Sequence, residues 1–264
     1  MREATRVIDR MRTDPPPRGS RITAPDGRKQ VLYEVLASGS GAVLAVFMWG
    51  HMFFVASILL GTRTFDTIAQ WMEHVYVAQP TVFIVLALFV LHAVLAGRKV
   101  PAQLRERKRA FALASDLKQS TRRWTGGDAL TRPHAESWIW IWQVRSALLI
   151  GILGSFHILL MGLDIFSDLF GRMEGIEAVS SMARTRAGLV WLYLPLLIAV
   201  EFHASVGLLR LAVKWGPGNR LSRRTLWRIE HVIFWSFIGL GLLVLVVLAG
   251  WIDPPLAFLT GDGP

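Results

Sequence analysis

Cysteine is absent from the 264 residues of this chain. Its absence excludes disulfide bonds, thiolate metal sites, iron–sulfur clusters and covalent attachment of haem through C-x-x-C-H. Charged residues are also few, at 18%, which is below the ~25% usual for soluble domains. With 53% hydrophobic residues and a mean hydropathy of +0.42, the composition favours a membrane protein.

Five long apolar stretches fill most of the sequence. They are residues 35–61, 75–97, 136–162, 186–213 and 226–251. Each is near or above the ~20 residues with which a helix crosses a bilayer. Residues 1–33 are basic and polar, without the apolar segment of a secretory signal. We therefore expect an all-α integral membrane protein built as a five-helix bundle.

The segments between the apolar stretches are alternately rich and poor in lysine and arginine. Eight precede residue 35, one lies in 62–79, ten in 98–135, two in 163–185, four in 214–225 and none after Asp253. Basic connections stay in the cytoplasm, so we expect a cytoplasmic N-terminus and a C-terminus outside. The expected segments are a cytoplasmic basic arm (1–34), a transmembrane domain (35–251) and an extracytoplasmic tail (252–264). The net charge of +10 then sets the orientation in the membrane and provides contact with anionic lipid and docking of a partner. Binding of nucleic acid is not expected.

The cytoplasmic loop 98–135 has apolar residues at helical spacing among its charges, including Leu104, Phe111 and Leu113. This pattern predicts a helix in the middle of the loop. Two interpretations stay open, an interfacial helix lying on lipid headgroups and a landing surface for a soluble subunit.

One histidine lies inside each of the first four apolar stretches: His51, His92, His157 and His203. Ionisable residues inside a membrane are rare, face the bundle interior and mark functional sites. A packing hydrogen bond explains one such residue, but four of them favour metal coordination. Neutral imidazole is an iron ligand, and helix bundles hold cofactors between facing helices.

Depth sorts these histidines into pairs. His92 lies six residues before Arg98, and His203 is similarly placed in its stretch, so both lie about 10 Å inside the cytoplasmic face. His157 lies at a similar depth from the outer face, and His51 lies central to outer. We expect an inner pair, His92 with His203, and an outer pair, His51 with His157. Each pair predicts one bis-histidine haem, and without cysteine both haems are b-type.

Haem propionates need cations or hydrogen-bond donors at the membrane edge. Candidates at the cytoplasmic ends of the helices are Ser38, Trp140, Gln143 and Lys214. For Lys214, interfacial snorkelling of a long cationic side chain is an equally good explanation.

Four stretches closely resemble the dihaem cytochrome b membrane subunit of succinate:quinone oxidoreductases, in particular of quinol:fumarate reductases. They are GHMFFVASILLG (50–61), LHAVLAGRK (91–99), LGSFHI (153–158) and AVEFHASVGLLRLAVKWG (199–216). The resemblance covers the first four helices and their spacing. It implies five helices, two b haems on the four histidines, and the same pairing.

The resemblance also implies a place in a complex. The chain anchors an iron–sulfur subunit and an FAD-containing subunit to the bacterial cytoplasmic (inner) membrane, and a dimer of the complex is a further expectation. Electrons pass between menaquinol or quinone and the iron–sulfur subunit. Succinate and fumarate interconvert in the FAD subunit, so this chain belongs to an enzyme but carries no dicarboxylate chemistry itself.

Two carboxylates gain a role from the resemblance. Glu73, expected at the outer start of the second helix, looks like the family's glutamate at the quinol-oxidising site, where a carboxylate can take the proton that a quinol loses. Glu201 resembles the family's glutamate on a transmembrane proton route. The alternatives are a solvated loop residue for Glu73 and a fixed hydrogen bond to a neighbouring helix for Glu201.

Two other functions use the same histidines. One is a dihaem cytochrome b of a hydrogenase or formate dehydrogenase, against which the 201–216 stretch argues. The other is a non-redox, proton-coupled transporter with the histidines and Glu201 as a relay, although the paired Gly/Pro-broken segments of many transporters are missing. Co-purifying subunits and haem absorbance discriminate among the three.

Overall fold

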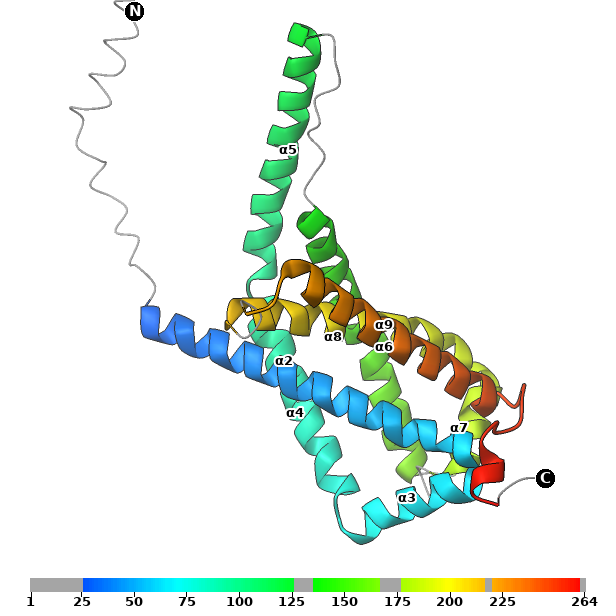
Figure 1. The fold of residues 1–264 in the computed structure, drawn as a ribbon. Helices are drawn as coiled ribbons and strands as arrows, with labels where there is room; N and C mark the ends of the chain where they lie inside the picture. Colours follow the sequence, from blue (N-terminus) through cyan, green and yellow to red (C-terminus); the bar gives the residue numbers. More distant parts are fainter. Residues whose placement is uncertain (1–25, 126–134, 167–176, 217–219, 262–264) are drawn as a thin grey trace, which may run out of the picture. The chain divides into compact units, whose positions relative to one another are not determined.

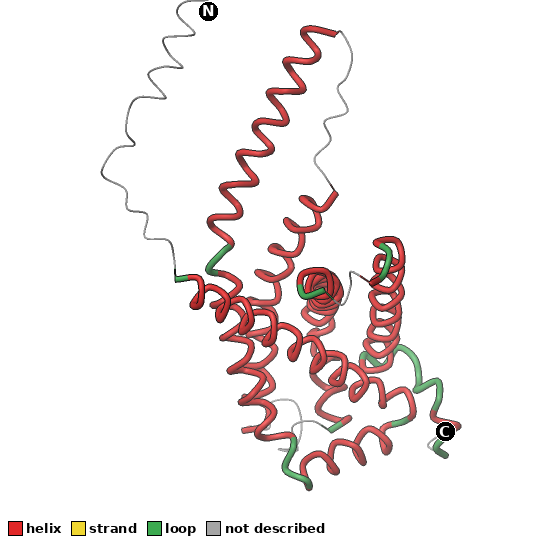
Figure 2. The backbone as a smooth tube through the Cα atoms, turned by 60° about the vertical axis from the view of Figure 1, so that its left-hand side comes forward, coloured by secondary structure: helices red, strands yellow, loops and turns green. Residues whose placement is uncertain are grey.

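The protein is described by a computed structural model over residues 26–125, 135–166, 177–216 and 220–261. In chain order the α-helices are α2 (Gly27–Ala56), α3 (Thr62–His74), α4 (Ala78–Gly97), α5 (Val100–Thr125), α6 (Ala135–Phe166), α7 (Ala178–Arg184), α8 (Val190–Lys214) and α9 (Arg223–Leu248). Three shorter segments are η1 (Ser57–Leu60), η2 (Thr185–Leu189) and η4 (Ala257–Leu259). The described residues contain no strand, and Figure 2 shows helices joined by short turns. The predicted all-α class is confirmed.

Five segments are long and apolar enough to cross a membrane, as predicted. They are Gly27–Leu60, Pro80–Leu113, Trp138–Leu163, Ala178–Lys214 and Arg223–Leu248. The chain divides after Val35 into two units. Residues 1–25 of the predicted basic arm lie outside the described residues, whereas residues 27–34 form the start of α2. The predicted orientation in the membrane stays a prediction. We therefore name the two ends of the bundle by their chemistry: the basic end has the α4–α6 and α8–α9 connections, and the opposite end has α3, α7 and η4.

Helix α8 packs against both α6 and α9 (Figure 1). Its buried residues include Leu197, Ala199 and Val200, but also two polar residues, Glu201 and Ser205. Buried polar side chains in a membrane span need a structural or functional reason. The polar face of α8 is therefore a place to look for chemistry.

A small apolar core closes the opposite end of the bundle. It joins Ile58 and Leu59 of η1, Phe65 of α3, Ala178 of α7 and the last turns of α9. The C-terminal tail folds back onto this end, where the Leu256 N–H donates to the Leu59 carbonyl at 2.9 Å. This cap fixes the ends of three spans relative to one another.

One side chain ties α3 to α7 in this cap. Asp66 Oδ1 accepts from the Ala178 N–H at 2.7 Å and so satisfies a free donor in the first turn of α7. Burial raises the pKa of the Asp66 carboxyl above its usual value, the Ala178 hydrogen bond opposes this, and the charge of Glu177 adds to it. Glu177 in turn accepts from Gln70 Nε2 of α3 at 3.2 Å.

The predicted helix in the 98–135 loop is present as α5, which follows α4 after a two-residue turn (Figure 1). Its first turns pack against α6. Gln103 Oε1 accepts from Trp140 Nε1 at 3.2 Å, and the Arg107 guanidinium lies 4.6 Å from the centre of the Trp140 ring. These contacts attach the start of the basic helix to the bundle.

Candidate functional site

The inner histidine pair lies at the basic end of the bundle, on α4 and α8. The ring centroids of His92 and His203 are 6.3 Å apart. Glycine at position 41 of α2 makes room for one of these rings, since a Cβ there would lie 2.7 Å from His92 Cε1. The structure therefore brings together the two histidines that depth pairs on this side.

Both inner rings are held by the same kind of hydrogen-bonding group. His92 Nδ1 lies 3.0 Å from the Ala37 carbonyl and 3.3 Å from Ser40 Oγ. His203 Nδ1 lies 3.1 Å from the Gln143 carbonyl and 3.4 Å from Ser146 Oγ. In each case a helix presents a carbonyl and a serine three residues later. A carbonyl oxygen only accepts, so each Nδ1 carries a hydrogen and each Nε2 keeps its lone pair for a metal.

The outer pair lies towards the opposite end, on α2 and α6. The ring centroids of His51 and His157 are 6.4 Å apart. His51 stacks on Phe47 at 5.9 Å, and His157 meets Tyr193 edge-on at 5.5 Å. His157 Nδ1 is buried without a hydrogen-bond partner in the described structure. The outer rings are thus held mainly by aromatic neighbours, unlike the inner rings.

The spacing of both pairs fits an iron atom between two imidazoles. A transition-metal–imidazole bond is about 2.0 Å long, and a further ~1.2 Å from each nitrogen to its ring centre places the two centres about 6.4 Å apart. The observed separations are 6.3 and 6.4 Å. Ring spacing, free Nε2 atoms on the inner pair and the apolar helices around them fit two b haems.

The four propionate candidates lie at the basic end but differ in what they contact. Lys214 Nζ lies 3.5 Å from Ser38 Oγ, which joins α8 to α2. Gln143 Oε1 accepts from the Arg210 guanidinium, so this amide has a cationic neighbour. Trp140 gives its N–H to Gln103 of α5, which leaves the indole with no further donor.

The two carboxylates occupy contrasting places. Glu73 is exposed at the end of α3, not at the start of the second span as expected, because Tyr76 adopts a positive φ of 54° that separates α3 from α4. Glu201 is 1% exposed, its side chain lies beside the Trp49 indole, and its Oε2 has no hydrogen-bond partner in the described structure.

Sequence reasoning missed several polar residues around the histidines. The Arg184 guanidinium, 3% exposed, bonds to Ser181 Oγ at 3.0 Å and to Tyr193, the residue that contacts His157. It directly precedes η2, where the chain kinks at Gly188 with a φ of 101°. Neither Ser40 nor Ser146 was singled out either. Their only signal in the sequence is a small polar residue in an apolar run, which ordinary helix packing also produces.

Comparison with known proteins gives three relatives, all of them named as the same subunit of one enzyme. No protein-family model matches the chain. The chain is similar to the fumarate reductase cytochrome b subunit of Wolinella succinogenes, with 36% identity over 189 residues, which are 68% of this chain and 64% of that protein. It is also similar to the fumarate reductase cytochrome b subunits of two Helicobacter pylori strains, J99 and 26695. Each is 31% identical over 218 residues, 79% of this chain and 76% of the relative. The match thus spans slightly less than two thirds of the Wolinella protein.

Proposed function

Since the chain belongs to the family of fumarate reductase cytochrome b subunits and is a multi-pass membrane protein, we propose that it carries electrons between a quinol and a soluble partner through two b haems. The complex lies in the bacterial cytoplasmic membrane with the basic end of this chain in the cytoplasm. The FAD-containing and iron–sulfur subunits of the same complex dock at that end. Fumarate reduction by quinol and succinate oxidation by quinone are the same path in opposite directions.

The observation that carries this proposal is the pairing of the membrane histidines. Two pairs of rings, each with the spacing of a bis-histidine iron site, lie at different depths of one bundle. Each pair holds one haem, which supplies one-electron transfer when bound. The chain orients the inner ligands through the Ala37 and Gln143 carbonyls, and it keeps both sites among apolar helices.

The basic end offers partners for the inner haem's propionates. Lys214 with Ser38 on one side, and Gln143 with Arg210 on the other, place donors and positive charge next to this pair. We propose these residues as propionate contacts. Trp140 acts instead by attaching α5 to the bundle, because its single donor is engaged by Gln103.

Glu73 and Glu201 are the two carboxylates that we propose to accept and carry protons. Glu73 is exposed at the opposite end, on the side of the outer histidine pair, and we propose that it accepts the proton released when a quinol is oxidised there. Glu201 lies buried between the two ends. A carboxylate with an unpartnered oxygen at that depth supports a role on a proton route across the membrane.

Helix α5 is the element of this chain best suited to contact the iron–sulfur subunit. Its described side chains include Arg105, Arg107, Lys108 and Arg109, against the single carboxylate Glu106 in that turn. Its contacts with Trp140 attach its start to the basic end of α6. We therefore favour a landing surface over an interfacial helix for this segment, with lipid headgroups as its neighbours only near the bundle.

Substitution of the ligands tests the proposal. His92→Ala and His203→Ala should abolish the same haem component, and His51→Ala and His157→Ala the other, because each haem needs both members of its pair. Redox titration of each purified variant should show loss of one of two components. Loss of the same component in His51→Ala and His203→Ala would show that the pairing is wrong.

A further inference from the structure

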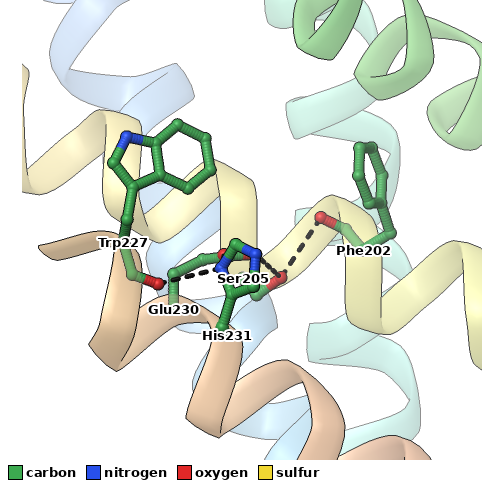
Figure 3. Close-up of polar contacts among 5 residues, drawn as sticks. All are labelled: Phe202, Ser205, Trp227, Glu230 and His231. Carbon is green, nitrogen blue, oxygen red and sulfur yellow. Dashed lines mark hydrogen bonds and ion pairs between the residues drawn. The ribbon is translucent and has the colours of Figure 1, made fainter. Parts of the chain in front are cut away.

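A second carboxylate lies buried inside a membrane span, and no role proposed above uses it. Glu230, near the basic end of α9, is 7% exposed. Burying a carboxylate in an apolar helix interface is costly unless it is paired or functional. Glu230 has neighbours on both of its oxygens, which Figure 3 shows together with the helices that carry them.

One oxygen connects Glu230 to the polar face of α8. Glu230 Oε1 accepts from Ser205 Oγ at 3.2 Å, and this hydrogen bond is buried. Ser205 itself is 4% exposed and lies four residues after Glu201, so the two project from the same face of α8. Two buried polar residues therefore lie on one face of α8, and the one nearer the basic end contacts Glu230 of α9.

The other oxygen connects Glu230 to the surface. Glu230 Oε2 lies 2.6 Å from His231 Nδ1, although the pair is not aligned as a hydrogen bond. The His231 side chain is 61% exposed. Its Nδ1 also lies 2.9 Å from the Trp227 carbonyl, so Nδ1 carries a hydrogen and Nε2 is the free nitrogen of this ring. An exposed titratable ring thus lies against a buried carboxylate.

We propose that Glu230 and His231 form a proton-exchange site between the basic end of the membrane and the α8–α9 interface. The inference rests on the proposed function, in which protons cross the membrane with electron transfer. His231 Nε2 takes a proton from a hydronium ion of the solvent, and Nδ1 passes its own proton to Glu230 Oε2 after a small rotation of the ring. The products are a water molecule, a neutral carboxylic acid and a neutral imidazole with its hydrogen on Nε2, so one proton has entered the interface and the charge of the hydronium ion has been cancelled by that of the carboxylate. The reverse sequence releases a proton to water.

Other charged groups at this end belong to the elements packed around the site. They are Arg210 and Lys214 on α8, with Glu201 one turn beyond Ser205, Arg220 before α9, and Arg223, Arg224 and Arg228 on α9. On α2, residues 36–49 contain no titratable side chain. The test variants leave all of these groups in place, so a change in pH dependence reports on Glu230 and His231.

The experiment compares Glu230→Gln, His231→Ala and the wild type in the purified, haem-loaded complex. Ser236→Ala, an exposed substitution on the same helix, is the control. We expect both haem components in every variant, and quinol-driven turnover that falls by about 10²-fold in Glu230→Gln, at the lower end for a lost acid–base group. His231→Ala should be slowed as well and restored by added imidazole buffer, because the missing ring is exposed. Imidazole should not restore Glu230→Gln.

Infrared difference spectra give a readout that needs no turnover. On acidification the wild type should show a carboxylic acid C=O band, and this band should be missing in Glu230→Gln. In His231→Ala the band should be present, but its shift on transfer to D₂O should be slow. The exchange site would be overturned if Glu230→Gln had the same pH profile and turnover as the wild type. It would also be overturned if imidazole left the defect of His231→Ala unchanged. A wild type without quinol-driven turnover would instead overturn the proposed function, while the infrared band would still decide whether Glu230 exchanges protons through His231. If Glu230→Gln loses its haems, the exposed His231→Ala variant carries the test.

Discussion

Replacing Gly41 by alanine should displace the ring of His92 and selectively weaken the inner haem site. A Cβ at position 41 would lie 2.7 Å from His92 Cε1 and 3.1 Å from Nδ1. Non-bonded carbons rest about 3.5–4.0 Å apart, so the ring would have to withdraw by about 0.8 Å or more. The clash falls on the ring itself, not on the end of a flexible side chain.

The cost of this displacement follows from what holds the ring. His92 Nδ1 is 3.0 Å from the Ala37 carbonyl, and withdrawal of the ring would stretch this hydrogen bond beyond a useful length, at a cost of roughly 0.5–1.5 kcal/mol. Loss of such an orienting partner typically lowers metal affinity by about 10–100-fold. We expect a loss of that size for the inner haem, with the outer haem unaffected.

Gly39→Ala is a matched control on the same helix. A Cβ at position 39 meets nothing within 4 Å, and alanine stabilises a helix interior by roughly 0.5–1 kcal/mol relative to glycine. The assay is a redox titration with haem quantified per chain in both variants. Two unchanged components in Gly41→Ala, or an equal loss in Gly39→Ala, would refute the role of Gly41 as the gap that admits the His92 ring.

Two further predictions concern carboxylates at the opposite end. Glu73→Gln should keep both haems and succinate oxidation by an artificial acceptor, but lower quinol-driven fumarate reduction by about 10²–10⁴-fold. The exposed His74 could replace it, so the double variant Glu73→Gln/His74→Ala should be measured too, and near-normal quinol oxidation there would remove this site. Asp66→Asn should raise the thermal stability of the protein at about pH 7, because the amide oxygen still accepts from the Ala178 N–H without the partly buried charge. Since the pKa of Asp66 is raised on folding, the wild type gains stability as pH falls through that pKa and loses it above. The variant should therefore gain less on acidification, and an equal gain in thermal unfolding scans would contradict this.

The spans and the histidine positions could be predicted because both depend on local sequence. A membrane span is defined by its length and apolarity, so the five segments appear directly in the hydropathy. Depth along a helix follows from residue number alone, which is why His92 and His203 can be paired without any structure. The helix in the 98–135 loop was likewise visible from its apolar spacing.

What the sequence could not show arises from contacts between distant segments. Helix α3 buries Phe65 and Ala69 against segments that follow much later in the chain, and in the sequence its stretch reads as a polar loop. The Ala37 and Gln143 carbonyls that orient the inner rings belong to the backbone, which carries no residue-specific signal. The buried position of Glu230 likewise depends on a contact between two helices, its hydrogen bond with Ser205 of α8.

The haem content of the purified chain tests the account most directly. The protein should be expressed with its native membrane insertion, its reduced-minus-oxidised spectrum recorded, and its haem quantified per chain. The account predicts two b-type haems per chain, which separate as two components in a redox titration. A folded, membrane-inserted chain with no Soret band, or with a single haem that survives substitution of either histidine pair, would contradict it.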